Sequence, residues 1–111
     1  MTAHKLAMRE VLIGARWLIS DPARWTKRSY ARDRNDQPCD LKGTEACSWC
    51  AVGAIHAAAA IFTDGGKVLG GAAVASFAKT NFLFSGIGDH NDWASHAKVL
   101  TWFDNAIKAL S

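Results

Sequence analysis

Cys50, two histidines and their polar neighbours are the residues of this chain whose types and order could support hydrolytic chemistry. Cys50 falls near the start of a predicted helix, where the helix dipole can lower the pKa of a thiol. His90 or His96 could act as a base that Asn91 or Asp92 orients, which supplies the parts of a cysteine-dependent hydrolase or transferase. The opposing interpretation is that Cys50 is a small apolar residue in the core, as free cysteines usually are. The residues favour that interpretation, and with it a protein that is not an enzyme.

Cys39, Cys47, Cys50 and His56 have the spacing C-x7-C-x2-C-x5-H, and thiolate and imidazole are ligands that zinc prefers. If residues 47–56 are helical, however, Cys47 and Cys50 share a face, while His56 lies about 240° round the helix from Cys50. The chain also has no second C-x2-C or H-x3-H half-site. The sequence therefore predicts no metal and no other cofactor. It leaves Cys39, Cys47 and Cys50 as the candidate ligands of a structural zinc site.

The segment 24–34 combines five basic side chains with two aromatic ones. Its candidate binding residues are Arg24, Trp25, Lys27, Arg28, Tyr30, Arg32 and Arg34. Cations neutralise phosphate and aromatic rings stack on bases, so this composition could bind nucleic acid. The alternative is a solvated loop whose rings pin it to the helices. The charge is local, since residues 1–34 carry a net charge of +5 and residues 35–111 a net charge of −2, within a total of +3.

Helical periodicity predicts four helices that would position these residues. We expect them over about residues 3–20, 45–62, 67–79 and 96–110. Asp21-Pro22 should end the first helix, because the residue before proline avoids the helical region, and Ser95 should cap the last.

The second predicted helix is the most informative because it carries Cys50. We expect Thr44 to cap this helix and a buried stripe to follow. The stripe consists of Cys47, Cys50, Ala51, Ala54, Ala58 and Ile61. Gly53 and the alanines are small enough for another backbone to approach closely, so the helix is expected at the centre of the fold.

Two stretches are predicted to be irregular. Residues 21–43 contain a turn signal at residues 34–38, and the flanking residues 30–33 and 39–41 could pair as a β-hairpin. Residues 81–88 are apolar but punctuated by glycine, which leaves both a short strand and a packed loop open.

The whole chain has the size and composition of one domain, residues 1–111. Half of its residues are hydrophobic and about a fifth are charged, which excludes wholesale disorder. The longest apolar run, residues 51–62, is too short to span a bilayer, and the first ten residues lack an apolar signal core. Together with the odd number of cysteines, these features predict a cytoplasmic protein without membrane contact. The expected fold class is mainly α: a small single-domain bundle of about four helices, with an irregular insertion, open to a β-hairpin, after the first helix.

Four short motifs in order resemble a family of small uncharacterised proteins from bacteriophages and from bacterial, often actinobacterial, genomes. The motifs are Trp25 with Ala31-Arg32-Asp33, then Trp49-Cys50-Ala51-Val52-Gly53-Ala54, then Asn91-Asp92, and last His96 with Val99-Leu100 and Ala106-Ile107. The family pattern reads approximately W-x-x-G-x-x-A-R-D, W-C-A-x-G-A, and N-D before a T-x-x-E-V-L helix. Arg28 stands near the glycine of that pattern, Ser95 at its threonine and Lys98 at its acidic residue. The resemblance covers about residues 6–108 and implies a compact domain of phage or prophage origin, with no particular reaction.

Together these features predict a small binding module without catalytic activity, such as a phage accessory protein that contacts a host protein. Its working surface would combine residues 24–34 with a loop predicted at residues 89–96. The partner is expected to be a protein, while nucleic acid stays open through residues 24–34, as do the cysteine hydrolase and the zinc domain. The five tryptophans supply one criterion, because two of them exposed together would mark a protein contact surface.

Overall fold

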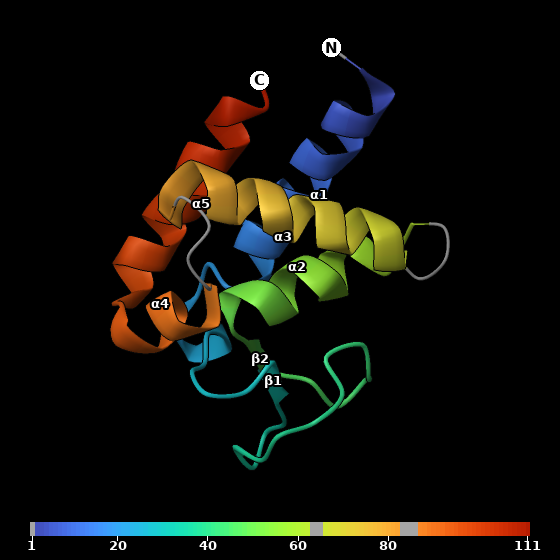
Figure 1. Cartoon of the computed structure of the whole chain (residues 1–111). Helices are drawn as coiled ribbons and strands as arrows, with labels where there is room; N and C mark the ends of the chain where they lie inside the picture. The colour runs from blue at the N-terminus through green and yellow to red at the C-terminus, as the bar shows by residue number, and fades with distance from the viewer. Residues whose placement is uncertain (1, 63–65, 83–86) are drawn as a thin grey trace.

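A computed structural model of the chain describes residues 2–62, 66–82 and 87–111. The elements in these residues are, in chain order, α1 (Ala3–Leu18), the 3-10 helix η1 (Pro22–Arg24), β1 (Ala31–Arg32), β2 (Ser48–Trp49), α2 (Ala51–Ala59), α3 (Lys67–Phe82), α4 (Ile87–Trp93) and α5 (His96–Ala109) (Figure 1). The predicted fold class is confirmed, because four main helices carry the domain and a small antiparallel sheet follows the first of them. Among the described residues, no helix is both long enough and apolar enough to cross a bilayer.

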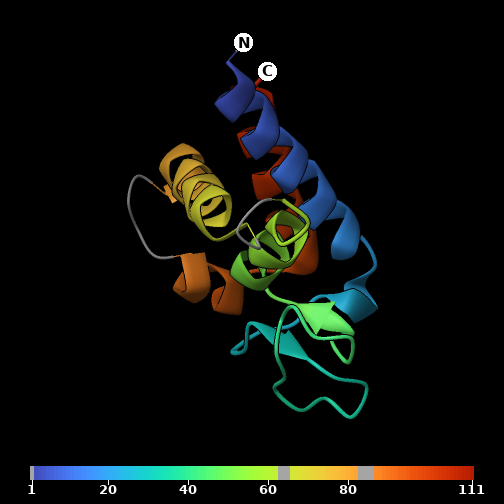
Figure 2. The same ribbon diagram turned by 90° about the vertical axis from the view of Figure 1, so that its right-hand side faces the viewer.

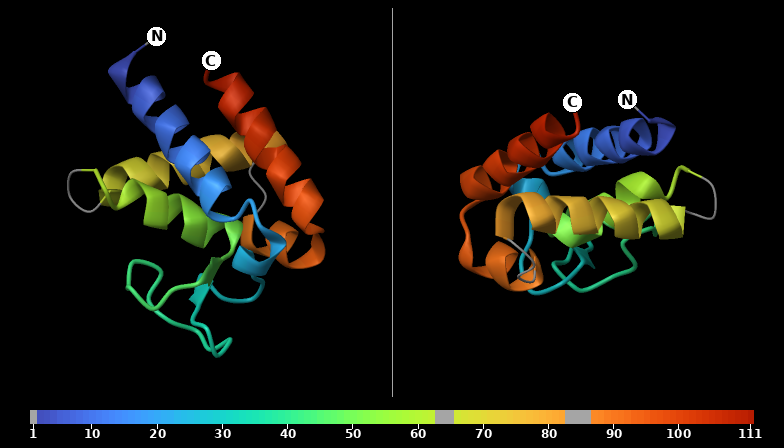
Figure 3. Two further views of the ribbon diagram at one scale, coloured as in Figure 1. Left: turned by 180° about the vertical axis from the view of Figure 1, so that it is seen from behind. Right: turned by 45° about the horizontal axis from the view of Figure 1, so that its top comes forward.

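The long helices pack around one another with both chain ends on the same side. α1 and α5 run side by side in opposite directions, so that the two termini lie close together at the top of Figures 1 and 2. α2 and α3 contact each other and lie against the same side of this pair (Figure 3). The sheet and the loop of residues 31–47 occupy the opposite end of the molecule from the termini (Figure 2).

The core draws a large buried side chain from each long helix. Leu12 of α1, Ile55 of α2, Phe77 of α3 and Phe103 of α5 are all fully buried. The rings of Phe77 and Phe103 meet edge to face with 4.6 Å between their centroids. Burying one such side chain stabilises a fold by about 1.5–3 kcal/mol. Buried alanines between them let the helix backbones approach closely.

The first and last helices begin where the sequence predicts. The Thr2 hydroxyl accepts a hydrogen bond from the Lys5 N–H (3.2 Å) at the start of α1, and the Ser95 hydroxyl accepts one from the Lys98 N–H (3.1 Å) at the start of α5. α1 ends at Leu18, two residues before the predicted end, whereas α3 continues three residues beyond its predicted end at 79.

The predicted helix over 45–62 is wrong at its start. α2 begins only at Ala51, because Ser48–Trp49 pairs as a strand with Ala31–Arg32 and Cys50 is the N-terminal cap residue. Thr44 therefore lies in a loop and caps nothing. At the two ends of the predicted stripe, Cys47 is exposed and Ile61 is 86 % exposed.

The predicted hairpin pairs differently, and one helix was not predicted. Ala31–Arg32 forms its two-residue ladder with Ser48–Trp49, while the stretch after the turn joins it through a single bridge between Arg32 and Pro38. Of the stretch 81–88, the first two residues end α3 and the last two begin α4, while 83–86 lie outside the described residues. The predicted loop at 89–96 consists largely of α4 and the start of α5.

Candidate binding surface

A fully buried asparagine joins three segments that are far apart in the sequence. Asn91 of α4 accepts hydrogen bonds through Oδ1 from the Trp25 ring N–H (2.8 Å) and from the Ala51 backbone N–H (3.1 Å). Its Nδ2 donates to the carbonyl of Thr26 (3.1 Å). The first backbone N–H of a helix has no partner within that helix, so Asn91 satisfies a group of α2 that would otherwise be orphaned. The residue thereby fixes α2 and the segment after η1 against α4.

Asp92 holds the neighbouring turn in an unusual conformation. Arg28 has φ +63°, a region that glycine enters freely and other residues rarely adopt. The Asp92 carboxylate accepts a hydrogen bond from the Arg28 backbone N–H at 2.8 Å, which stabilises this conformation. The family pattern has glycine near this position, and the positive φ gives the physical reason for that preference.

Trp25 and His96 extend the same network to α1 and α5. The Trp25 ring packs against the His96 ring with 5.8 Å between centroids, and the Lys27 ammonium lies 5.2 Å from the Trp25 ring centre. His96 Nε2 lies 2.6 Å from the carbonyl oxygen of Ile19. Because a carbonyl only accepts, Nε2 carries the proton in this contact and serves as a donor. The contact ties the start of α5 to the end of α1.

Two of the basic residues of segment 24–34 contact the fold itself. Arg32 donates from its guanidinium to the carbonyls of Asp36 (2.9 Å) and Lys27 (3.3 Å). Arg24 donates to the Trp17 carbonyl (3.3 Å), and its guanidinium lies over the Trp17 ring. These two arginines therefore organise the segment from inside.

Four polar or aromatic side chains of this region face solvent. Trp93, beside Asp92 at the end of α4, is 87 % exposed, and Tyr30 is 62 % exposed. Arg28 and Arg34 are exposed as well. We call Arg28, Tyr30, Arg34 and Trp93 the Asn91 surface, because the Asn91 and Asp92 contacts hold its two segments together. The structure thus brings the predicted segments 24–34 and 89–96 into one region.

The candidate thiol site is arranged as a helix cap. Cys50 is 6 % exposed, and its sulfur accepts a hydrogen bond from the Gly53 N–H (3.3 Å). Burial raises the pKa of the Cys50 thiol, and the hydrogen bond from Gly53 only partly offsets that effect. Within the described part of the chain, His96 contacts the Ile19 carbonyl and His90 stacks on the Phe82 ring with 4.1 Å between centroids. None of these contacts joins a histidine to the Cys50 sulfur.

The other two cysteines lie in the loop that follows β1. Cys39 is half-buried and Cys47 is exposed, and in the described part of the chain no three His, Cys, Asp or Glu side chains gather as a metal site would require. Partial burial raises the pKa of the Cys39 thiol, and the nearby carboxylates of Asp33 and Glu45 raise it further.

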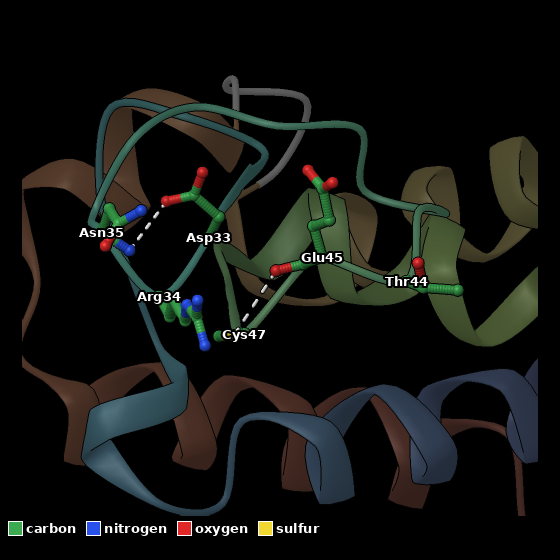
Figure 4. A pocket seen from close by; sticks show the side chains of 6 residues that line it. All are labelled: Asp33, Arg34, Asn35, Thr44, Glu45 and Cys47. Atoms are coloured by element: carbon green, nitrogen blue, oxygen red, sulfur yellow. Dashed lines mark hydrogen bonds between the residues drawn. The ribbon is translucent and has the colours of Figure 1, made fainter.

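This loop forms a polar hollow of about 420 Å³ next to the Asn91 surface. It is lined by Asp33, Arg34, Asn35, Thr44, Glu45 and Cys47 (Figure 4). The Asp33 carboxylate accepts hydrogen bonds from the backbone N–H groups of Asn35 (2.8 Å) and Gln37 (3.1 Å), so it shapes the turn at the rim. Charges of both signs line the hollow, and Arg34 belongs both to it and to the Asn91 surface.

Comparison with known proteins places the chain in a family by sequence. The model of the family of unknown function DUF6197 matches residues 4–109. The chain belongs to that family. No curated protein and no solved structure matches the chain.

In this DUF6197 protein the residues that resemble the family pattern are largely those that join its segments. Trp25, Cys50, Asn91 and His96 each make a contact that closes the fold between distant parts of the chain or begins a helix. Sequence reasoning weighed Asn91 as an orienting group or a turn former and missed its role in satisfying α2. The available signal was the Asn91-Asp92 pair a few residues ahead of the helix that Ser95 caps. Sequence reasoning placed Cys47 in the buried stripe and among the candidate metal ligands, whereas the structure leaves its thiol exposed.

Proposed function

We propose that this DUF6197 protein is a small binding module without catalytic activity, whose Asn91 surface docks onto an acidic patch of a partner protein. The observation that carries the proposal is the exposure of Trp93, Tyr30, Arg28 and Arg34 on two segments that the Asn91 and Asp92 contacts hold together. Tryptophan, tyrosine and arginine are the residues that contribute most binding energy at protein interfaces. Monomeric proteins rarely leave such groups in water together without a use for them.

The framework supports docking because it limits the entropy that binding would otherwise cost. Asn91 is buried and fully bonded, and Asp92 fixes the backbone of Arg28. A surface that is rigid before it meets a partner loses less conformational freedom on binding. The resemblance of the motifs to phage and prophage proteins supports a further part of the proposal, that the protein acts as an accessory factor and its partner is a bacterial host protein in the cytoplasm.

Site-specific photo-crosslinking tests this surface. p-Benzoylphenylalanine replaces Tyr30 in one variant and Ile61, which is 86 % exposed on another face, in the control. After irradiation in an extract of bacterial cells, we expect a discrete protein adduct from position 30 and none of the same mass from position 61. No adduct from position 30, or the same adduct from both, would refute the proposal. If nuclease treatment removes the adduct, the partner is a nucleic acid and not a protein.

Substitutions added to the protein that carries the crosslinker at position 30 then identify the side chains that contact the partner. Arg28→Gly removes the guanidinium but keeps the backbone N–H and suits φ +63°, so the fold is expected to stay intact. We expect Arg28→Gly and Trp93→Ala each to lower the adduct yield by about tenfold. Val68→Ala, which removes an exposed apolar side chain on α3 outside this surface, should leave the yield unchanged. An equal loss in all three variants would show that the adduct does not report the Asn91 surface.

A further inference from the structure

α3 has the composition of a covered helix, yet part of it faces outward. It contains no acidic residue, and its charged side chains are Lys67 and Lys79. Apolar residues occur round the whole helix, which is typical of a helix with neighbours on every side. In the structure α3 packs on α1, α2 and α5 but forms the outer layer (Figure 3), and Val68 is 74 % exposed. The open side of α3 is therefore the kind of surface that a further element covers.

A groove of about 830 Å³ follows this open side, between the start of α1 and the end of α5. Its floor is lined by the small side chains Ala72, Ala75 and Ser76 from one face of α3. Met8 of α1 and Leu110 at the end of α5 form the apolar part of the walls. Small side chains on a helix face allow a second helix to lie with its axis about 8–10 Å away. The shape and the chemistry of the floor suit an α-helix.

The charged side chains at the rim of the groove are lysines. Lys5 lines it on the α1 side and Lys79 on the α3 side, and none of its lining residues is acidic. In the described part of the chain the ion pairs are Arg16–Asp104 and Arg32–Asp36, so neither lysine of the groove has an acidic partner there. The two lysines are thus available to acidic side chains that flank an apolar stripe.

The charge and the shape of the groove together indicate what kind of ligand it binds. In a symmetric dimer through this face, each copy would place its own Lys5 and Lys79 against an equally cationic groove, and like charges repel. Proteins that lie on anionic membranes insert protruding Trp, Phe or Leu side chains, whereas here the apolar part is recessed and consists mostly of alanine. An acidic amphipathic helix meets both conditions, because its apolar stripe fits the floor and its acidic flanks reach the lysines.

We propose that the groove between α1, α3 and α5 binds an amphipathic helix of a partner protein, with acidic residues on both flanks of the helix. The start of α1 and the end of α5, which line the groove, lie at the opposite end of the domain from β1 and its loop (Figure 1). The proposal does not depend on the Asn91 surface. A domain with both sites would bridge two partner surfaces.

Fluorescence anisotropy with a synthetic probe tests the groove. The probe is a labelled 18-residue peptide with leucine and alanine at helical spacing i, i+3, i+4 and i+7 and with glutamate on both flanks. Two matched peptides accompany it: one has lysine in place of every glutamate, and one has the same composition in scrambled order. We expect only the first peptide to bind. Failure of that peptide to bind at millimolar concentration, or equal binding of the scrambled one, would overturn the proposal.

Charge-reversal variants locate the binding. Lys79→Glu reverses a charge at the rim, and Lys67→Glu makes the same change on the same helix outside the lining of the groove. Ala75→Glu fills the floor at an exposed position. We expect Lys79→Glu and Ala75→Glu each to weaken peptide binding at least about tenfold and Lys67→Glu to leave it within about twofold. Equal weakening by Lys67→Glu would show a general charge effect and refute the site.

Two further measurements exclude the other occupants. Sedimentation equilibrium is expected to show no dimer that Ala75→Glu disrupts, and vesicles of phosphatidylserine and phosphatidylcholine should not displace the peptide. A dimer that depends on Ala75, or displacement by the vesicles, would overturn the helix as the occupant. Arg28→Gly should leave peptide binding unchanged, so that failure at the Asn91 surface and failure at the groove can be told apart.

Discussion

Buried hydrogen bonds hold one end of this domain, whereas small apolar side chains shape the other. At the Asn91 end, a single side chain satisfies groups from Trp25, Thr26 and Ala51, and the contacts join segments more than 35 residues apart. At the groove end, alanines of α3 and α5 line the surface beside α1, and the charged side chains lie at the rim. The first end is therefore fixed by hydrogen bonds, and the second by the packing of small side chains.

The contrast indicates which end of the fold should lose stability on substitution and which end should tolerate it. A buried polar network loses stability sharply when one member is removed, because the remaining groups are left without partners. An alanine-lined surface has no such groups and tolerates change, so it can adapt to a partner. The following variants test that contrast, and their expected effects on stability decrease in order.

Asn91→Ala should have the largest effect. It leaves the Trp25 ring N–H, the Ala51 N–H and the Thr26 carbonyl without partners inside the fold. Each buried unsatisfied group costs about 1–3 kcal/mol, so the free energy of unfolding should fall by about 3–5 kcal/mol in a urea titration followed by circular dichroism. Asn105→Ala is the control, because Asn105 is exposed and bonds only the Asn81 side chain at 3.3 Å. If Asn91→Ala lowers the free energy of unfolding no more than Asn105→Ala does, the buried hydrogen bonds of Asn91 do not stabilise that end of the domain.

Alanine at two helical glycines should change stability in opposite directions. A Cβ at Gly53 would lie 1.9 Å from the carbonyl oxygen of Tyr30, so α2 or the Tyr30 backbone would have to move, at a cost of about 1–3 kcal/mol. A Cβ at Gly71 of α3 meets nothing within 4 Å, so alanine there should raise the unfolding free energy by about 0.5–1 kcal/mol through helix propensity. Thermal melts of the two variants would show the sign. Stabilisation by Gly53→Ala would contradict the close approach seen in the structure.

The sequence predicted the parts of the fold that local signals determine. Helix periodicity and side-chain caps depend on residues close together in sequence, so the start of α1 at about residue 3 and the Ser95 cap of α5 were predicted correctly. Small residues also predicted a close backbone approach near Gly53, which the Tyr30 contact confirms. The combination of segments 24–34 and 89–96 was foreseen as one region, though not the bond between Asp92 and Arg28 that joins them.

Long-range contacts decide the parts that local signals did not predict. α2 starts at Ala51 because the Cys50 N–H bonds the Tyr30 carbonyl and Asn91 bonds the Ala51 N–H, and neither partner is near in sequence. Thr44 followed by Glu45 is a good local start signal that these contacts override. α4 has seven residues, too few for a periodic pattern, and its stability comes from its neighbours. The groove depends on three helices meeting, which no single segment encodes.

Thiol labelling should separate the two kinds of cysteine without changing the sequence. Cys47 is exposed, whereas Cys50 is buried with a raised pKa. Since the thiolate is the reactive form, iodoacetamide at pH 8 should modify Cys50 at least about tenfold more slowly than Cys47, as peptide mapping by mass spectrometry would show. In urea the two rates should converge. Equal rates in the native protein would mean that the Cys50 sulfur is open to reagents, and would favour the cysteine hydrolase over the binding module.

The smallest effect is expected from the pH dependence of the boundary between α2 and α3. His56 packs its ring on Gly70, so that Nδ1 lies 2.7 Å from where a Cβ on that glycine would be. Partial burial, and then the charge of Lys42, lower the pKa of His56. The unfolded chain therefore binds a proton at this residue more readily than the folded one, and the free energy of unfolding should fall as the pH drops below about 6.5.

His56→Gln should flatten this part of the stability curve, because the substituted side chain binds no proton. His4→Gln is the matched control, since His4 lies exposed in the first turn of α1. Urea midpoints between pH 5 and 8 would compare the two variants with the parent chain. A slope that persists in His56→Gln and disappears in His4→Gln would place the titrating group at the groove end. Such a result would assign the pH response to the start of α1 and refute the role of His56.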